Sequence, residues 1–253
     1  MVHRAGSSRN TLAAGALILV GLTGVGGRSL GAGGDSRRQT QNDEQLAEMR
    51  HHFLQVTGIH EAVVRGDLQA VAKPATALSL TVLPPGMPAA GELFLANVRA
   101  AGRRAATARN LATAASAAAS MLTQCGNCHL SLGVRPPIVA RQTPDVGGLV
   151  GHMLQHERAV GELARGLLLP SASEWRRGAG DLQAAALRSR ELPPDAKLTP
   201  SIQRAEVRVH QLASRAEAAE TPEGRETTYA AVITTCAECH GLHREIWGPR
   251  SQR

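Results

Sequence analysis

The chain has 253 residues, a formal net charge of +7 and only 2% aromatic residues. Its length allows one large domain or two of about 110 residues, and so few aromatic side chains leave a core of that size short of large apolar groups. No basic run is long enough to indicate a nucleic-acid-binding protein.

The first 33 residues differ in composition from the rest. Arg4 and Arg9 precede an apolar stretch without acidic residues, 11–27, and small residues follow it. This order predicts a secretory signal peptide over residues 1–33 and hence a periplasmic or other extracytoplasmic location. An uncleaved anchor is the less favoured alternative, because the stretch is short and rich in glycine. Without the leader, 25 basic and 21 acidic residues remain, a net charge of +4, and no other apolar run approaches the length of a membrane span.

Four helices are expected next, over about 42–65, 67–80, 89–109 and from 110 onward. Abundant alanine favours helices, and no segment alternates with the two-residue period of a strand. In the first helix, apolar positions and one histidine recur at three- and four-residue spacing, which marks the inward row of an amphipathic helix. That row is Met49, His52, Val56, Ile59 and Val63.

The rest of the chain repeats this pattern. His52-Phe53-Leu54-Gln55 matches 152–155 at a shift of 100 residues, and the later matches follow in the same order at shifts of 109 to 114. Small changes of shift are typical of loop insertions in a duplicated unit. Thr199-Pro200 and Thr221-Pro222 each combine an N-cap residue with proline at the first helical position. The sequence therefore predicts an all-α fold of two tandem four-helix bundles, residues 34–144 and 145–253.

Each predicted unit carries a C-x-x-C-H motif in its last helix, at 125–129 and 236–240. Two thiols one helical turn apart can each add to a vinyl group of one porphyrin, and the adjacent histidine then lies beneath the iron. The sequence predicts two covalently bound haem c groups. The thioether anchors would be Cys125, Cys128, Cys236 and Cys239, and the proximal iron ligands His129 and His240.

Other functions of a C-x-x-C pair do not account for the histidine that follows each pair. A zinc site built from both C-x-x-C pairs would not require histidine after each pair, and the pairs are more than a hundred residues apart. A disulfide or a thioredoxin-like redox motif would not require that histidine either.

A four-helix unit with C-x-x-C-H near the end of its last helix resembles the cytochrome c-prime type of c-type cytochrome. The doubled arrangement is similar to dihaem helical cytochromes of bacterial periplasms. In cytochrome c-prime proteins, the first helix supplies an apolar residue on the distal side of the haem. Here the matching positions hold His52 and His152. The resemblance therefore implies the fold, whereas the five-coordinate iron of that family is in question.

His52 and His152 are the candidate distal ligands, because both lie on an inward row at the same place in the repeat. The alternative for each is a histidine satisfied by the protein or by solvent. His156 also faces inward but matches Val56, while His60 is expected to lie off the row. His210 is expected at the surface.

The expected function is one-electron transfer by an exported dihaem cytochrome with bis-His iron, a carrier and not an enzyme. Its partners would be redox proteins of an extracytoplasmic chain, and a homo-oligomer is left open. The main alternative is a gas-binding or sensing protein of cytochrome c-prime character with an open distal position. A dihaem peroxidase is less favoured, because only 13 residues follow His240. A haem-dependent assembly subunit is a further alternative.

Overall fold

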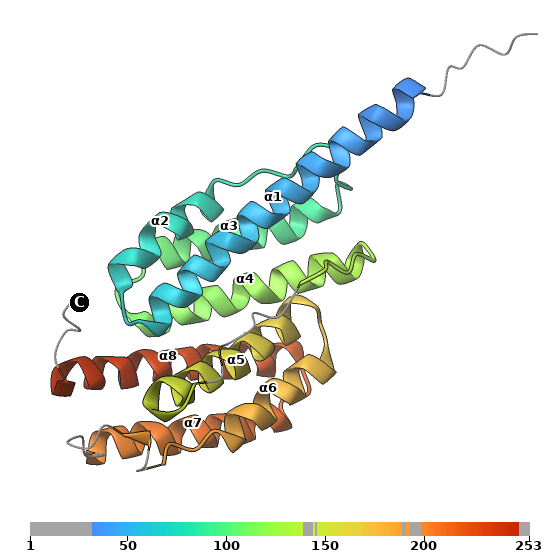
Figure 1. Cartoon of the computed structure of the whole chain (residues 1–253). Coiled ribbons are helices and arrows are strands. Elements are labelled where there is room, and N and C mark those ends of the chain that lie inside the picture. The colour runs from blue at the N-terminus through green and yellow to red at the C-terminus, as the bar shows by residue number, and fades with distance from the viewer. Residues whose placement is uncertain (1–31, 139–143, 145, 189–190, 193–198, 248–253) are drawn as a thin grey trace, which may run out of the picture. The chain divides into compact units, whose positions relative to one another are not determined.

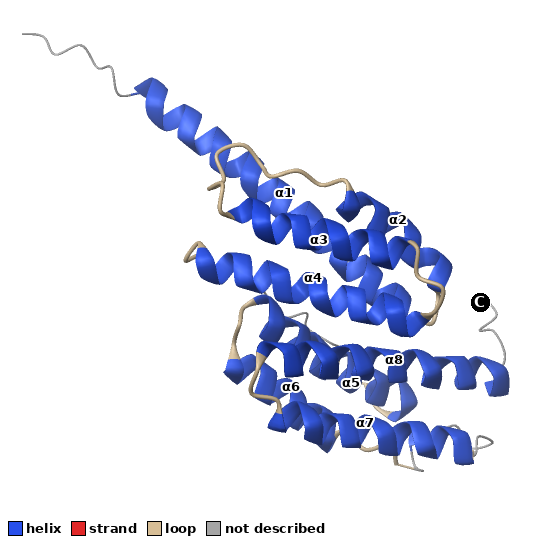
Figure 2. Cartoon of the chain, turned by 180° about the vertical axis from the view of Figure 1, so that it is seen from behind, coloured by secondary structure: helices blue, strands red, loops and turns tan. Residues whose placement is uncertain are grey.

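The computed structural model describes residues 32–138, 144, 146–188, 191–192 and 199–247, with side chains from residue 39 to 242 of these ranges. The described residues form eight α-helices and no strand (Figures 1 and 2), so the all-α prediction is confirmed. The predicted signal peptide lies outside the described residues except for its last two positions. None of the described helices is long and apolar enough to span a membrane.

The helix bounds agree with the expected order of elements. The helices are α1 Ala32–Val64, α2 Leu68–Ser79, α3 Gly91–Ala106, α4 Leu111–Ser131, α5 Gly148–Leu168, α6 Ala172–Ala184, α7 Pro200–Ala218 and α8 Pro222–Trp247. The main difference is the start of α1, which lies about ten residues before the expected position.

Side-chain caps begin several of these helices. Asn110 accepts a hydrogen bond from the Thr113 amide at 2.8 Å, and Thr199 accepts one from the Ile202 amide at 3.3 Å. Thr221 accepts one from the Gly224 amide at 3.0 Å before α8. Each cap satisfies one of the amides that a helix start leaves without an intrahelical partner.

The end of α1 is set by Gly66, whose φ of 71° is in the left-handed region. Its amide bonds the Val63 carbonyl at 2.8 Å, and the Asp67 amide bonds the Ala62 carbonyl at 2.9 Å. This is the Schellman arrangement, which favours glycine because other residues carry a steric penalty there. The carbonyl of Val64, the last residue of α1, is not used in this pair of bonds.

The chain divides into two compact units, 1–38 and 39–253. Within 39–253 we call α1–α4 the first quartet and α5–α8 the second quartet. Neighbouring helices from α2 to α4 and from α5 to α8 pack together, and α4 also packs against α5 and α8 (Figure 1). A Cβ atom at Gly58 of α1 would lie 3.7 Å from Pro74 of α2. Buried apolar residues of both quartets belong to one core cluster. The division into two haem-binding units at residue 144 stays a prediction.

The inward row of the first helix is confirmed from His52 onward, whereas Met49 is only partly buried. Val56, Ile59 and Val63 are buried, and His52 is buried beside them with 8% of its surface exposed. In the second quartet, His152 is 2% exposed. The two candidate distal histidines therefore occupy matching places on α1 and α5.

Candidate haem-binding sites

The two cysteine motifs lie within helices α4 and α8. We call Cys125, Cys128 and His129 the first site, and Cys236, Cys239 and His240 the second site. All four cysteines are free thiols. Burial raises the pKa of Cys125 and of Cys236 to about 12, and the neighbouring thiol of each motif adds to the effect. The thiols are therefore protonated at neutral pH.

The motif histidines are oriented by backbone carbonyls. The Nδ1–H group of His129 donates to the Leu168 carbonyl at 3.2 Å, and that of His240 donates to the Val64 carbonyl at 2.7 Å. A proton on Nδ1 fixes the tautomer in which Nε2 carries the lone pair. This is the arrangement that orients a metal-ligating histidine.

Both carbonyls belong to the other quartet. Val64 is the last residue of α1 and contacts a histidine of α8, whereas Leu168 is the last residue of α5 and contacts a histidine of α4. Carbonyls at a helix end lack an intrahelical donor. The first helix of each quartet therefore ends at the motif histidine of the opposite quartet.

Close packing holds α4 against the end of α5. A Cβ atom at Gly126, inside the first motif, would lie 2.1 Å from the Leu167 carbonyl oxygen and about 3 Å from the ring of Pro170. The matching residue of the second motif is Ala237, which is buried. The first site therefore depends on the absence of a side chain at Gly126.

In the first quartet, His52 is held by polar partners. Its Nε2 atom lies 3.0 Å from the Glu48 carboxylate and hydrogen bonds the Thr81 hydroxyl. Burial lowers the pKa of His52, and the Glu48 carboxylate opposes this shift. Ligation of iron through Nε2 would replace these contacts.

In the second quartet, His152 lies in a polar cluster. Its Nε2 atom is 3.4 Å from Glu206, and its Nδ1 atom is 3.7 Å from Glu191. The ring of His156 lies 4.3 Å away between centroids, and its Nε2–H donates to the Ala185 carbonyl at 2.9 Å. Burial lowers the pKa of His156, and the neighbouring His152 lowers it further.

Each candidate distal histidine lies at the same end of its quartet as the thiols. Burial raises the pKa of Cys239, and the carboxylate of Glu206, which contacts His152, raises it further. In the first quartet, a Cβ atom at Gly91 would lie 4.0 Å from the Cys128 sulfur and 3.2 Å from Leu83. Leu83 is two residues beyond Thr81, the partner of His52.

Large apolar side chains are exposed along the segments that build the first site. Five of them are more than a third exposed: Phe53, Leu80, Val82, Leu93 and Leu130. Along the sequence, Phe53 follows His52, and Leu80 and Val82 flank Thr81. Leu93 comes two residues after Gly91, and Leu130 follows His129. A porphyrin is a large apolar body of the kind that such side chains can contact. The thiols, the oriented histidines and this apolar surround fit haem.

The described residues do not support zinc held by both cysteine pairs. Across them, the group of ligating side chains close enough to hold one metal ion is His152, His156 and Glu206, which contains no thiol. The two cysteine pairs therefore do not meet at one metal position.

One histidine has a partner that the sequence did not indicate, and the expectation for another was wrong. His60, expected off the inward row, is partly buried and hydrogen bonds the Tyr229 hydroxyl of α8 through Nδ1 at 2.7 Å. His210, expected at the surface, turns a buried Nε2 atom toward Glu206, 3.7 Å away. The sequence analysis also did not identify Glu206. Its matching position in the first repeat holds Leu95, and this replacement of an apolar residue by a carboxylate is the signal that could have identified it.

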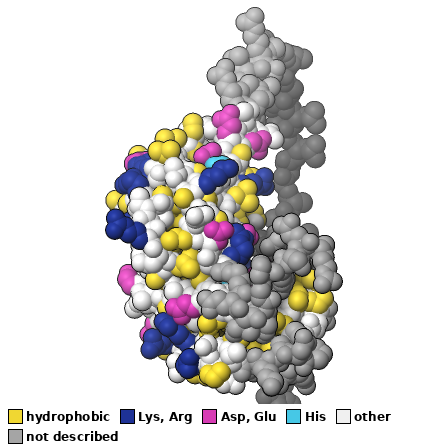
Figure 3. Space-filling view, turned by 90° about the vertical axis from the view of Figure 1, so that its left-hand side faces the viewer, with side chains coloured by type: hydrophobic (Ala, Val, Ile, Leu, Met, Phe, Trp, Pro, Cys, Tyr) yellow, Lys and Arg dark blue, Asp and Glu magenta, His cyan; other side chains and the backbone are white. Residues whose placement is uncertain are grey.

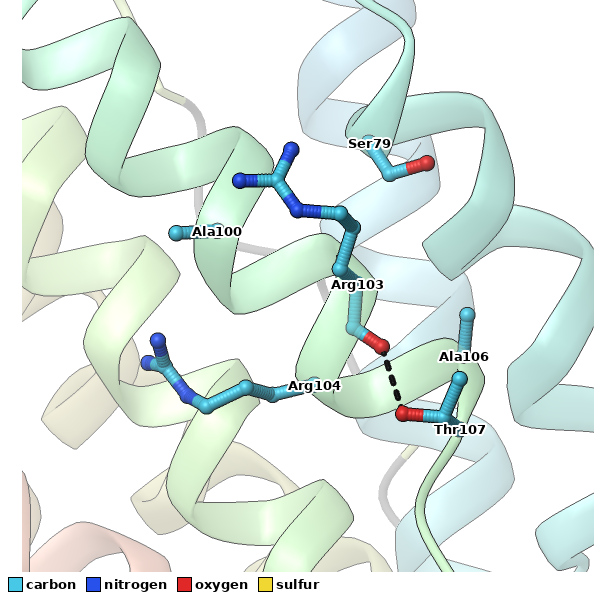
Figure 4. A pocket seen from close by; sticks show the side chains of 6 residues that line it. All are labelled: Ser79, Ala100, Arg103, Arg104, Ala106 and Thr107. Atoms are coloured by element: carbon cyan, nitrogen blue, oxygen red, sulfur yellow. Dashed lines mark hydrogen bonds between the residues drawn. The ribbon is translucent and has the colours of Figure 1, made fainter.

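Other surfaces carry no residue of these sites. A hollow at the ends of α2 and α3 is lined by Ser79, Ala100, Arg103, Arg104, Ala106 and Thr107 (Figure 4). On the face in Figure 3, basic and acidic side chains are interspersed with apolar ones.

Neither a protein-family model, nor a curated protein, nor a solved structure matches this chain.

Proposed function

We propose that the protein is an exported dihaem cytochrome c that acts in one-electron transfer. The observation that carries the proposal is the Nδ1–H bond from each motif histidine to a helix-end carbonyl, at 3.2 Å for His129 and 2.7 Å for His240. The same orientation at both repeats of one motif is what a pair of iron ligands requires, whereas a solvated histidine has no need of it.

In this proposal, the cysteines attach the haems and the motif histidines bind the iron. Cys125 and Cys128 anchor the first haem, and Cys236 and Cys239 anchor the second. His129 and His240 direct Nε2 toward iron from the proximal side. When bound, each haem supplies a reversible one-electron centre whose potential depends on its axial ligands and on burial.

His52 and His152 are the distal residues in this proposal. Both are buried, both lie at the thiol end of their quartet, and each would give a six-coordinate iron suited to electron transfer. The leader, the extracytoplasmic location and the redox-protein partners belong to the same proposal. A carrier of this kind needs no organic substrate.

One observation favours a second candidate, a gas-binding haem protein. The Nε2 atoms of His52 and His152 already contact the carboxylates of Glu48 and Glu206. If these contacts persisted beside haem, the distal position would stay open and the two histidines would face a bound gas molecule instead of iron.

Mass spectrometry of protein matured in a secreting host tests the proposal, with a mass increase of two haems expected. A low-temperature electron paramagnetic resonance spectrum then separates the candidates. Low-spin iron at both sites supports the carrier, and high-spin iron that binds carbon monoxide supports the gas-binding protein. His52→Ala should convert one haem to high spin, whereas His51→Ala, an exposed neighbour, should leave both unchanged. Protein without covalent haem would end the proposal.

A further inference from the structure

The two sites differ in charge although their motifs are the same. At the shift of 111 residues that relates the cysteine pairs, Glu206 matches Leu95 and His210 matches Arg99. At the shift of 100, His156 matches Val56. The second quartet therefore holds a carboxylate and two imidazoles where the first holds two apolar side chains and a guanidinium.

Matching helices carry these positions and pack beside the two motifs, with partner positions about one helical turn apart. Asn97 of α3 bonds Gln124 of α4 at 3.1 Å, beside the first motif. The residue that matches Asn97 is Arg208 of α7, which pairs with Glu238 of the second motif at 3.5 Å. Leu95 and Glu206, each two residues earlier, lie on these matching helices; Leu95 is buried, and Glu206 acts electrostatically on the Cys239 thiol.

The carboxylates at the second site are shielded from water. The side chain of Glu206 is 13% exposed and that of Glu191 is 23% exposed, and both contact His152. Within the described part of the chain, their ion-pair partners are histidines. The Oε2 atom of Glu206 is buried without a hydrogen-bond partner there. Charges removed from water are screened less than exposed ones.

The first site carries a weaker negative field. Glu48, which contacts His52, is 43% exposed. The guanidinium of Arg99 bonds the Thr81 carbonyl at 3.3 Å and pairs with Glu92, so the two charges offset one another. The first site thus has one solvated carboxylate, and the second has two that are largely buried.

We propose that Glu206 holds the second haem at a lower reduction potential than the first, so that electrons enter at the second site and leave from the first. This inference rests on the proposed function. A buried negative charge near the haem stabilises ferric over ferrous iron and so lowers the reduction potential. One electron passes from a reduced donor protein to the second site, then to the first, and then to an oxidised acceptor protein.

Spectroelectrochemical titration of the full haem-loaded chain tests this. Two one-electron steps are expected. E206Q should raise the lower reduction potential by at least 59 mV, which corresponds to a tenfold change in the equilibrium constant of a one-electron step. The upper potential should stay unchanged. E206D keeps the charge and should keep the low potential. Glu217→Gln changes the same charge at an exposed position of α7 and should move neither step.

The inference is overturned if E206Q leaves the lower step in place or raises the upper one. It is also overturned if E206D behaves as E206Q, because the carboxylate charge would then not be the cause. Failure of the proposed function is distinct, since the chain would then lack two covalent haems by mass and show no redox steps.

Discussion

The contact between Gly126 and the end of α5 gives a quantitative test of how the first site is built. In Gly126→Ala, the new Cβ atom would lie 2.1 Å from the Leu167 carbonyl oxygen. Carbon and carbonyl oxygen approach each other to roughly 3.3 Å, so α4 and the end of α5 must separate by about 1 Å. That movement carries the Leu168 carbonyl away from His129, which it meets at 3.2 Å.

Two terms of opposite sign set the stability of Gly126→Ala. Alanine gains up to about 1 kcal/mol over glycine inside a helix. Overpacking in a filled contact costs about 1–3 kcal/mol, and a lengthened hydrogen bond costs about 1 kcal/mol more. The net expectation is a loss of about 1–3 kcal/mol, and each kcal/mol lowers Tm by about 2–4 °C in a chain of this size.

Thermal and urea unfolding, followed by circular dichroism at the helix band, measure this difference. Gly161→Ala is the matched control, because Gly161 is also inside a helix, α5, and a Cβ atom there would meet no other atom within 4 Å. It should be as stable as the parent chain or more so. If Gly126→Ala were as stable as Gly161→Ala, the close contact between α4 and α5 would be refuted.

Three further predictions concern stability. Burial lowers the pKa of His60 from 6.5 to about 4, so the unfolded chain binds a proton at a higher pH than the folded chain does. The free energy of unfolding should therefore fall by about 3 kcal/mol between pH 6.5 and 4. Urea titrations of His60→Gln should lose that part of the pH dependence. Asn110→Ala should cost about 1 kcal/mol by the same assay, because it removes the cap of α4. Trp175→Phe should cost about 1–3 kcal/mol, since the indole N–H bonds the buried Ala216 carbonyl at 2.6 Å.

Each of these has a contradicting outcome. An identical pH slope in the parent chain and in His60→Gln would assign the effect to other groups. Asn110→Asp retains a capping oxygen and should keep most of the stability, so equal losses in Asn110→Asp and Asn110→Ala would contradict the cap. Trp175→Phe with unchanged stability would show that the Ala216 carbonyl finds another donor.

Local signals predicted most of the helices. Asn110 and Thr199 act within three residues of their own position, so a cap can be recognised without knowing the fold. The inward row of α1 follows in the same way, from a periodicity that depends on the helix alone. The assignment of the motif histidines as iron ligands also rests on adjacent residues of one motif, and it stays a prediction. These features need no information from distant parts of the chain.

The partners across the quartets could not be predicted in this way. His60 lies next to the inward row of α1, on a side that would face water in a solitary four-helix bundle. In this chain α8 covers that side, and the Tyr229 hydroxyl, 169 residues away, bonds His60. Periodicity tells which residues of a helix are buried against its own bundle, but not which further helix covers the remaining face.

The cross-quartet bonds to His129 and His240 join two separate requirements. A helix end needs donors for its last carbonyls, and a ligand histidine needs an acceptor that fixes its tautomer. Val64 and Leu168 meet both needs at once, each for the opposite quartet. A quartet alone would leave a helix-end carbonyl to solvent and a motif histidine free to rotate. Within the described residues, each motif histidine is therefore oriented by the opposite quartet.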